Sequence, residues 1–336
     1  MTIKDIAQAC GVSVCTVSRV LNNRPDVSET VRQQVLEVVA RHNYIPNNSA
    51  RDLVRSQSEN IGVVVRGTGT PFFSDMLKTV TRELDAAGCN MVLRQISSDD
   101  DEVKAGAILE REKKLRGLLF LGGRFDYTPA ELALVGVPYV CCSYTNQFGT
   151  LKKEDFASVS IDDYATAYAA VSTLIECGHT RIAALVPSCK DHSISQLRFH
   201  GYLKALEDHG IPFDEALLSE AGGFSMEDAY KGTCALLESG AEFTAMFTIS
   251  DVMAIAAIKA LADHGLRVPE DCSVIGIDGI ELSNYCIPTL TTMVQPVDEM
   301  ARESVHILLD MLYHGSPSRH LLLKTRLREG GSVRQL

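Results

Sequence analysis

Side chains suited to nucleic-acid recognition are concentrated near the start of the chain, between Ser13 and Asn22. An arginine in this segment can donate two hydrogen bonds to guanine, and small apolar side chains can contact a thymine methyl group. Short hydroxyl and amide side chains suit phosphate oxygens. The predicted major-groove residues are Val14, Cys15, Thr16 and Arg19, and the predicted phosphate-binding residues are Ser13, Ser18 and Asn22.

Three short helices are expected to position these side chains. Thr2 can cap the first helix, which ends at Gly11, and Ile6 and Ala9 are expected to face inward. Ser13 can cap a second helix that stops before Pro25, and Ser28 a third. A helix-turn-helix places its second helix in the major groove of DNA. The alternative is a surface helical bundle that happens to carry an arginine.

Charge is distributed unevenly along the 336 residues, whose net charge is −11. Residues 1–58 hold seven Lys/Arg against five Asp/Glu, which leaves −13 for the remainder. A mildly basic head on an acidic body is expected if only the head meets phosphates. No apolar run approaches about 18 residues and no secretion signal is visible, so we expect a cytoplasmic protein without a membrane span.

From Ile61 onward, continuous apolar runs such as "IGVVV" and "CSVIGID" alternate with helical segments. This pattern predicts parallel sheets covered on both faces, divided between two similar α/β lobes. The ten cysteines are scattered without a C-x-x-C pair, which predicts reduced and mostly buried thiols, with only a weak case for redox chemistry at Cys141 and Cys142.

"TIKDIAQACGVSVCTVSRVLNN", followed by "VSETVRQQVLEVVARHNYIPN", resembles the headpiece of the LacI/GalR family of bacterial transcription regulators. Later landmarks, including "ECGHTRIA", "LRFHGYLKAL", "SDVMAIAAIKAL" and "RLREGGSV", extend the resemblance over almost the whole chain. The resemblance implies a homodimeric DNA-binding regulator, most simply a repressor, that reads a near-palindromic operator. It also implies a periplasmic-binding-protein-like body. The implied divisions are a headpiece at 1–46, a hinge at 47–58, an N-terminal lobe at 61–158 and 290–320, and a C-terminal lobe at 159–289 and 321–336.

The resemblance maps Leu53 onto the family's intercalating hinge leucine, which would wedge into the minor groove and kink the duplex. Ala50 is small enough to let two such hinge helices approach closely. The alternative for Leu53 is the ordinary apolar face of a short helix. The chain ends without an apolar heptad tail, which favours a dimer over a tail-linked tetramer.

The resemblance also places a small-molecule effector between the lobes, at the carboxyl ends of the strands. An Arg and an Asp can bind vicinal hydroxyls, and an aromatic ring can cover the apolar face of a sugar. Other interpretations are an interlobe Arg198–Asp278 ion pair, a core position for one phenylalanine, and a helix cap at Asp162. The implied effector residues are Phe72, Phe73, Asp162, His192, Arg198, Phe224, Ser250 and Asp278.

Departures from the family pattern leave the chemical identity of the effector open. Ser250 stands where relatives often carry Asn, which removes a two-way hydrogen-bonding amide, and the chain has no Trp. A carbohydrate is expected, with a nucleobase or another metabolite as the alternative.

Two rival functions are weaker. An enzyme is disfavoured because "GTGTPFF" lacks the third glycine of a dinucleotide fingerprint and no catalytic set is recognisable. A free-standing sugar-binding transport protein would not carry the N-terminal headpiece. No cofactor or metal is expected.

Overall fold

The computed structural model describes residues 2–21, 24, 26–42, 59–67, 70–190 and 192–336. The chain divides into two compact units, Met1–Ser58 and Glu59–Leu336. Asn22 and the predicted hinge, with Ala50 and Leu53, lie outside the described residues.

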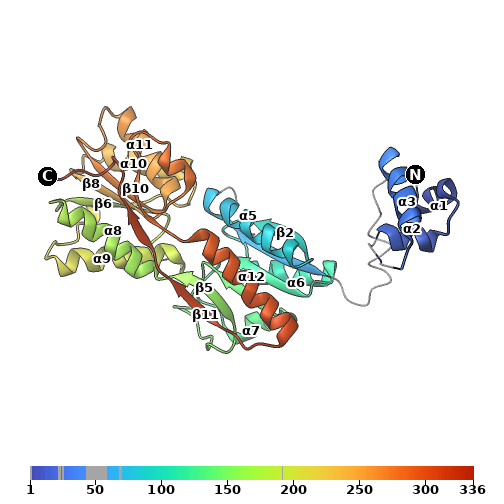
Figure 1. The fold of residues 1–336 in the computed structure, drawn as a ribbon. Helices are drawn as coiled ribbons and strands as arrows, with labels where there is room; N and C mark the ends of the chain where they lie inside the picture. Colours follow the sequence, from blue (N-terminus) through green and yellow to red (C-terminus); the bar gives the residue numbers. More distant parts are fainter. Residues whose placement is uncertain (1, 22–23, 25, 43–58, 68–69, 191) are drawn as a thin grey trace. The chain divides into compact units, whose positions relative to one another are not determined.

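The first unit is built from helices α1 (Ile3–Cys10), α2 (Val14–Leu21) and α3 (Glu29–Arg41), as Figure 1 shows. Thr2 and Asp5 form a capping box at the start of α1, and Gly11 ends that helix in a left-handed conformation with φ +63°. Both features follow from local chemistry, because the short Thr side chain satisfies a free backbone N–H and glycine tolerates positive φ. The prediction that Ala9 faces inward was wrong: Ala7 and Cys10 are buried, and Ala9 is exposed.

Val35 of α3 completes the small core of this unit, together with Ile6, Ala7 and Cys10 of α1 and Val17 and Val20 of α2. Ser28 stands at the N-terminus of α3, as expected, but its side chain makes no capping hydrogen bond.

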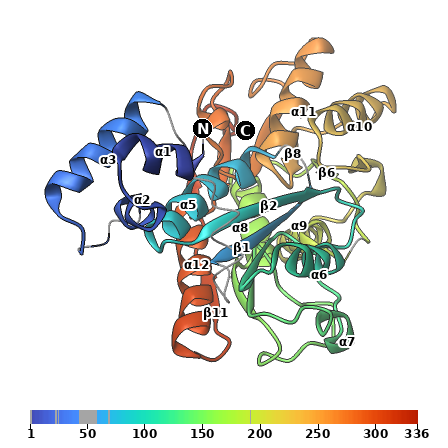
Figure 2. The ribbon, with the colours of Figure 1, turned by 90° about the vertical axis from the view of Figure 1, so that its right-hand side faces the viewer.

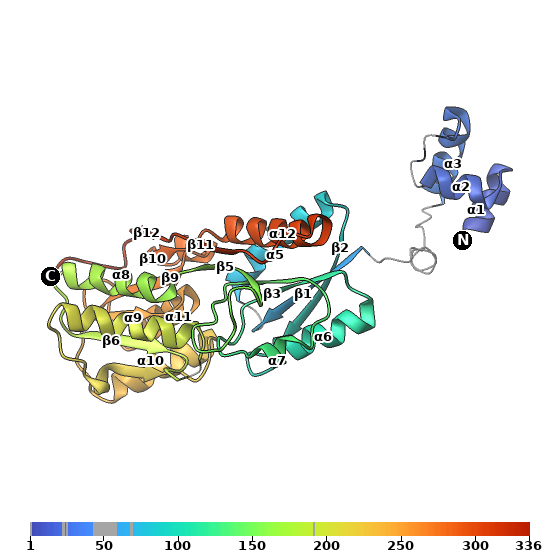
Figure 3. The same cartoon turned by 90° about the horizontal axis from the view of Figure 1, so that it is seen from below.

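A parallel six-stranded sheet forms the first lobe of the second unit, in the order β11-β5-β4-β3-β1-β2. Its strands are β1 (Asn60–Arg66), β2 (Asn90–Ile96), β3 (Gly117–Leu121), β4 (Tyr139–Cys142), β5 (Ala157–Ile161) and β11 (His320–Leu323). Its helices are α5 (Pro71–Ala86), α6 (Glu102–Lys113), α7 (Pro129–Leu132) and α12 (Val297–His314). Helices α5 and α12 pack side by side on one face (Figures 1 and 2), and α6 and α7 lie on the other (Figure 3).

Alternation along β1 explains why both faces need helices. Val63 and Val65 belong to the core beneath α5 and α12, whereas Val64 belongs to the core on the α6 side. Successive strand side chains point to opposite faces, so a continuous apolar run supplies two cores at once.

The second lobe contains another six-stranded sheet, in the order β12-β10-β9-β8-β6-β7. Its strands are β6 (Ile182–Val186), β7 (Leu218–Glu220), β8 (Ala245–Thr248), β9 (Ser273–Asp278), β10 (Thr291–Val294) and β12 (Arg326–Arg328). Only β12, of these strands, pairs antiparallel with its neighbour, and that neighbour is β10.

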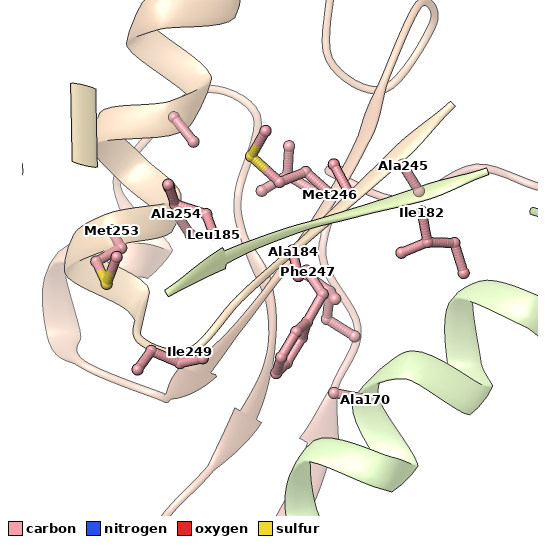
Figure 4. Packing of buried hydrophobic residues seen from close by; sticks show 14 of the residues in the cluster. Ala170, Ile182, Ala184, Leu185, Ala245, Met246, Phe247, Ile249, Met253 and Ala254 are labelled. Atoms are coloured by element: carbon pink, nitrogen blue, oxygen red, sulfur yellow. The ribbon is translucent and has the colours of Figure 1, made fainter. Parts of the chain in front are cut away.

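Helices α8 (Asp163–Glu176) and α9 (Ile194–Asp208) lie on one side of this second sheet, and α10 (Met226–Glu238) and α11 (Asp251–Asp263) lie on the other (Figure 1). Figure 4 shows apolar side chains of the sheet between these layers, among them Ala184 and Phe247, with Met253 of α11 and Ala170 of α8.

The three crossings between the lobes come later in the chain than we expected. We expected them near Ser158, Thr289 and Leu321, but β5 and β11 belong to the first sheet and β10 to the second. The chain therefore crosses after Ile161, Val294 and Leu323. Short apolar strands give no local signal of which sheet they join, because pairing depends on partners far away in the sequence.

All ten cysteines are free thiols, as expected, but only five are buried; four are half-buried and Cys15 is exposed. Over the described part of the chain, no helix is both long and apolar enough to cross a bilayer.

Candidate functional site

Helix α2 presents a solvent-facing surface made of predicted DNA-contact residues. Val17 and Val20 face the core, while Val14, Cys15 and Arg19 are exposed. This division follows from helical geometry, since residues three apart lie on one face.

The polar residues of α2 that we expected to contact DNA are not all fully exposed to solvent. Thr16 and Ser18 are half-buried. The hydroxyl of Ser13 accepts a hydrogen bond from Thr16 N at 3.1 Å and lies 2.9 Å from Thr16 Oγ1, so Ser13 also serves as the helix cap.

Arg19 has one charged partner in the described headpiece. Its Nη1 atom lies 3.3 Å from Asp26 Oδ2, and both side chains are 54% exposed. An exposed ion pair of this kind stabilises a protein by at most about 1 kcal/mol. Arg19 can therefore exchange Asp26 for a base edge at small cost.

In the second lobe, Arg198 is the centre of a buried charged cluster. It is only 1% exposed, donates a hydrogen bond from Nε to Asp163 Oδ1 at 2.8 Å, and forms an ion pair in which Nη2 lies 2.8 Å from the same oxygen. Its Nη1 atom donates to the carbonyl of Ile249 and lies 3.6 Å from Asp278 Oδ1. Arg198 and Asp278 both belong to the second lobe, so their ion pair does not bridge the lobes as the alternative interpretation supposed.

Negative charge exceeds positive charge in this cluster. Burial raises the pKa of Asp278 to about 7, the positive charge of Arg198 opposes that rise, and nearby Asp251 adds to it. Burial also raises the pKa of Asp163 and of Asp251 above the ordinary range. Burial disfavours a charged carboxylate, and one guanidinium cannot fully compensate three of them.

Asp251 fixes the backbone immediately after Asp278. Its Oδ2 atom accepts hydrogen bonds from Gly279 N at 2.8 Å and Ile280 N at 3.0 Å, and its Oδ1 accepts from Thr292 Oγ1. Asp278 itself has φ +135°, a region that non-glycine residues rarely adopt. Strained backbone held by its surroundings is typical of functional sites.

Two predicted effector residues serve as helix caps. Asp162 is exposed, and its Oδ1 accepts from Ala165 N at 2.9 Å. Ser250 is buried, and its hydroxyl accepts from Met253 N at 3.4 Å. The capping interpretation of Asp162 thus describes its contact in this structure, whereas its neighbour Asp163 reaches Arg198.

The predicted aromatic residues differ in burial. Phe72 is 6% exposed and belongs to the core beneath α5 and α12, whereas Phe73 and Phe224 are half-buried. Phe73 packs edge-on against Phe72, with ring centroids 5.3 Å apart. One of the two adjacent phenylalanines is therefore a core residue.

His192 contacts the first lobe. Its carbonyl accepts from Phe125 N at 2.9 Å, its Nδ1 lies 3.3 Å from Asp126 Oδ2, and its ring stacks on Phe148 with centroids 5.1 Å apart. The structure thus places His192 in an interlobe contact, apart from the Arg198 cluster.

Sequence reasoning missed Asp163, Asp251 and Gln295 as members of this cluster. The doubled acid in "IDDY" was a usable signal for Asp163, since two adjacent acids at a helix start face different directions. Gln295 donates from Nε2 to Asp278 Oδ1 at 2.8 Å, and nothing local in "MVQPVD" indicates that partner.

A surface hollow of about 600 Å³ lies beside α8 and α9 and is lined by Tyr164, His200, Lys204, Phe213 and their neighbours. None of the eight predicted effector residues lines it. The Arg198 cluster is the place where predicted effector residues do meet.

A helix-turn-helix unit joined to a two-lobed α/β body, with a buried charged cluster at the carboxyl ends of its strands, defines the class of ligand-regulated DNA-binding proteins. The comparisons with known proteins agree. Residues 2–47 match the family model "Bacterial regulatory proteins, lacI family", and residues 171–333 match the model "Periplasmic binding protein-like domain".

Over 342 residues, the chain is 38% identical to the HTH-type transcriptional regulator MalR of Clostridium butyricum, covering 99% of each chain. It matches the solved structure of the transcriptional regulator CelR–cellobiose complex at 29% identity with a TM-score of 0.73, and the Lac repressor dimer bound to operator and the anti-inducer ONPF at 26% with 0.77. Each of these two matches covers 99% of both chains. The chain belongs to the lacI family of bacterial transcription regulators and is not an enzyme.

Proposed function

We propose that this regulator acts as a repressor in the cytoplasm and binds a near-palindromic operator in double-stranded DNA as a homodimer. The observation that carries the proposal is the two-sided character of α2, which buries Val17 and Val20 and exposes Val14, Cys15 and Arg19. Two copies of this helix read the two half-sites in successive major grooves. Thr16 joins these base contacts, and Ser13, Ser18 and Asn22 contact phosphates.

In this proposal the hinge at 47–58 enters the minor groove. Leu53 wedges between base pairs and Ala50 lets the two hinge segments approach each other. The DNA deformation then contributes to specificity at base pairs that the protein does not touch.

Exposed apolar side chains between β9 and β10 support the homodimer. Leu282, Tyr285 and Ile287 are 43%, 75% and 92% exposed, respectively. Large exposed apolar side chains close together are typical of a protein interface. We propose that this segment, 282–287, packs against a second copy of the chain, and the similar Lac repressor structure is described as a dimer.

We further propose that a small-molecule effector, a carbohydrate, binds between the lobes and changes operator affinity. Arg198 and Asp278 are the central residues, with Phe72, Phe73, Asp162, His192, Phe224 and Ser250 as the other proposed members. The similar CelR structure is a complex with cellobiose. An effector regulates DNA binding only if it binds the two conformations of the body with different affinity.

The DNA-binding proposal is tested by selecting sites from random duplex DNA and measuring their affinity by fluorescence anisotropy at two salt concentrations. We expect an inverted-repeat site whose preference over random DNA survives the higher salt, because base contacts add to the salt-dependent phosphate attraction. Arg19→Ala should reduce that preference. The matched control Arg41→Ala removes the same charge from exposed α3 and should leave the preference intact.

Loss of specific and random binding in equal proportion with Arg19→Ala would contradict the proposed base contact. A purified protein that stays monomeric, or that retains no inverted-repeat site, would contradict the repressor proposal.

A further inference from the structure

Asp26 places a carboxylate on the surface of the headpiece that is proposed to face DNA. Its Oδ2 atom lies 3.3 Å from Nη1 of Arg19, and both side chains are 54% exposed. The guanidinium is the part of Arg19 that is proposed to meet a guanine, so this carboxylate lies next to the proposed base contact. The sequence pattern did not indicate Asp26 as a residue of the DNA-binding surface.

The other described carboxylates of the headpiece serve their own helices. Asp5 belongs to the capping box of α1, and Glu29 and Glu37 pair with arginines within α3. Asp26, in contrast, lies between α2 and α3 and pairs with a residue of α2. An exposed ion pair adds little to stability, and a negative charge near phosphates weakens binding to any DNA. Neither stability nor general affinity for DNA therefore explains the position of Asp26.

The backbone on either side of Asp26 is fastened to the helices. Arg24 N donates to the carbonyl of Arg19 at 3.0 Å, and the side chain of Arg32 donates to the carbonyl of Arg24. Val27, the residue after Asp26, packs against the core of the headpiece. The carboxylate is thus carried by backbone that is anchored to α2, to α3 and to the core, so it can hold Arg19 in one orientation.

The ion pair leaves one edge of the Arg19 guanidinium for a base. Arginine has five N–H donors in a planar fork, and in the described structure Nη1 is the donor that approaches Asp26. The edge formed by Nε and Nη2 can donate two parallel hydrogen bonds to O6 and N7 of guanine while the carboxylate stays in place. Asp26 also offsets the charge of Arg19, which weakens the attraction of Arg19 to phosphates but leaves these two hydrogen bonds to guanine.

We infer that Asp26 is a specificity-determining positioning residue, which orients Arg19 towards guanine and lowers the affinity of the headpiece for random DNA. The inference rests on the proposed base contact of Arg19. An arginine that is already held in its binding orientation loses less conformational freedom when it meets the base. Removal of the Asp26 charge should therefore increase affinity for DNA in general and decrease discrimination between sites, a combination that a purely structural role does not produce.

The experiment compares full-length wild type and Asp26→Asn on the inverted-repeat site selected by the wild type and on a random duplex, by fluorescence anisotropy at several salt concentrations. Asp26→Asn keeps the shape of the side chain and removes its charge. We expect it to bind the random duplex about threefold or more tightly, with a steeper salt dependence, because one negative charge no longer opposes the phosphates. The ratio of operator affinity to random-duplex affinity should fall about tenfold. Asp26→Glu, which keeps the charge, should retain the low affinity for the random duplex.

The matched control is Glu37→Gln, which removes the same charge from an exposed position of α3 and should leave the affinity ratio unchanged. A second comparison, in the Arg19→Ala background, shows whether Asp26 acts through Arg19. In that background Asp26→Asn should leave the affinity ratio unchanged, because the arginine that Asp26 positions is absent.

An unchanged affinity ratio in Asp26→Asn overturns the inference, and the base contact of Arg19 still stands if Arg19→Ala lowers that ratio. An equal fall of the ratio with and without Arg19 also overturns the inference, because Asp26 then acts on DNA independently of Arg19. If Arg19→Ala leaves the wild-type ratio unchanged, the proposed base contact is wrong and the inference falls with it.

Discussion

Replacing Asp278 by asparagine should make the ligand-free protein more stable and less responsive to its effector. The Asp278→Asn substitution isolates the charge, because the two side chains have nearly the same shape. The pKa of Asp278 rises from 3.8 to about 7 because burial outweighs the attraction of Arg198. The folded state therefore favours the protonated carboxyl, and the wild type loses stability as pH rises from 3.8 through about 7.

The magnitude follows from the two pKa values. Each pKa unit corresponds to about 1.4 kcal/mol, so the ionised carboxylate costs the folded state on the order of 4 kcal/mol at pH 8. At pH 5 the same cost is less than about 2 kcal/mol, because the folded state is still largely protonated. The neutral amide of Asp278→Asn avoids this cost, so its advantage over the wild type should grow with pH.

Urea titrations of wild type and Asp278→Asn between pH 5 and pH 8 measure this difference. The matched control is Asp271→Asn, because the hydrogen bond from the Arg267 side chain lowers the pKa of half-buried Asp271 to about 2, the opposite direction. Asp271→Asn should therefore gain no stability at pH 8. A free-energy difference between wild type and Asp278→Asn that stays constant or shrinks as pH rises would refute the reasoning, as would an unchanged effector-induced thermal shift.

Four other substitutions test the remaining features. Arg19→Ala should cost about 1 to 3 kcal/mol at the cognate operator and spare random DNA, as read by fluorescence anisotropy. Leu53→Ala should reduce operator bending in a circular-permutation gel, and an unchanged bend would reject the wedge. Ile287→Asp should raise the dimer dissociation constant roughly tenfold or more in analytical ultracentrifugation, whereas Leu322→Asp, at a 60% exposed site, should not. Gly201→Ala should cost about 1 to 3 kcal/mol in urea, because its Cβ would lie 2.9 Å from that of Ala167 and force α8 and α9 apart; an unchanged midpoint would contradict this packing.

Predictions from the sequence succeeded where the interaction is local. The capping box of Thr2 and Asp5, the end of α1 at Gly11 and the two-sided α2 each depend on residues within about one helical turn. The alternation of apolar runs and helices gave the two α/β lobes, because burial on both faces of a parallel sheet leaves a continuous apolar run.

Predictions about the proposed effector site were less complete because the contacts within the Arg198 cluster are long-range. Arg198 and Asp278 come from segments 80 residues apart, and no pattern around either residue indicates their shared partners. The sequence also favoured the wrong one of two neighbouring carboxylates as the partner of this cluster. Asp162 caps α8, whereas Asp163, one residue later and turned about 100° around the helix, pairs with Arg198.

The sequence by itself determined the three helices of the headpiece, the exposed face of α2 and the alternation of strands and helices in the body, since local hydrogen bonds and side-chain periodicity specify them. Only the tertiary structure decided that β10 joins the second sheet, that His192 contacts the first lobe, and that Gln295 meets Asp278. Sheet pairing and the burial of charge depend on which distant segments come together, and that information is spread over the whole chain rather than held in any one stretch of it.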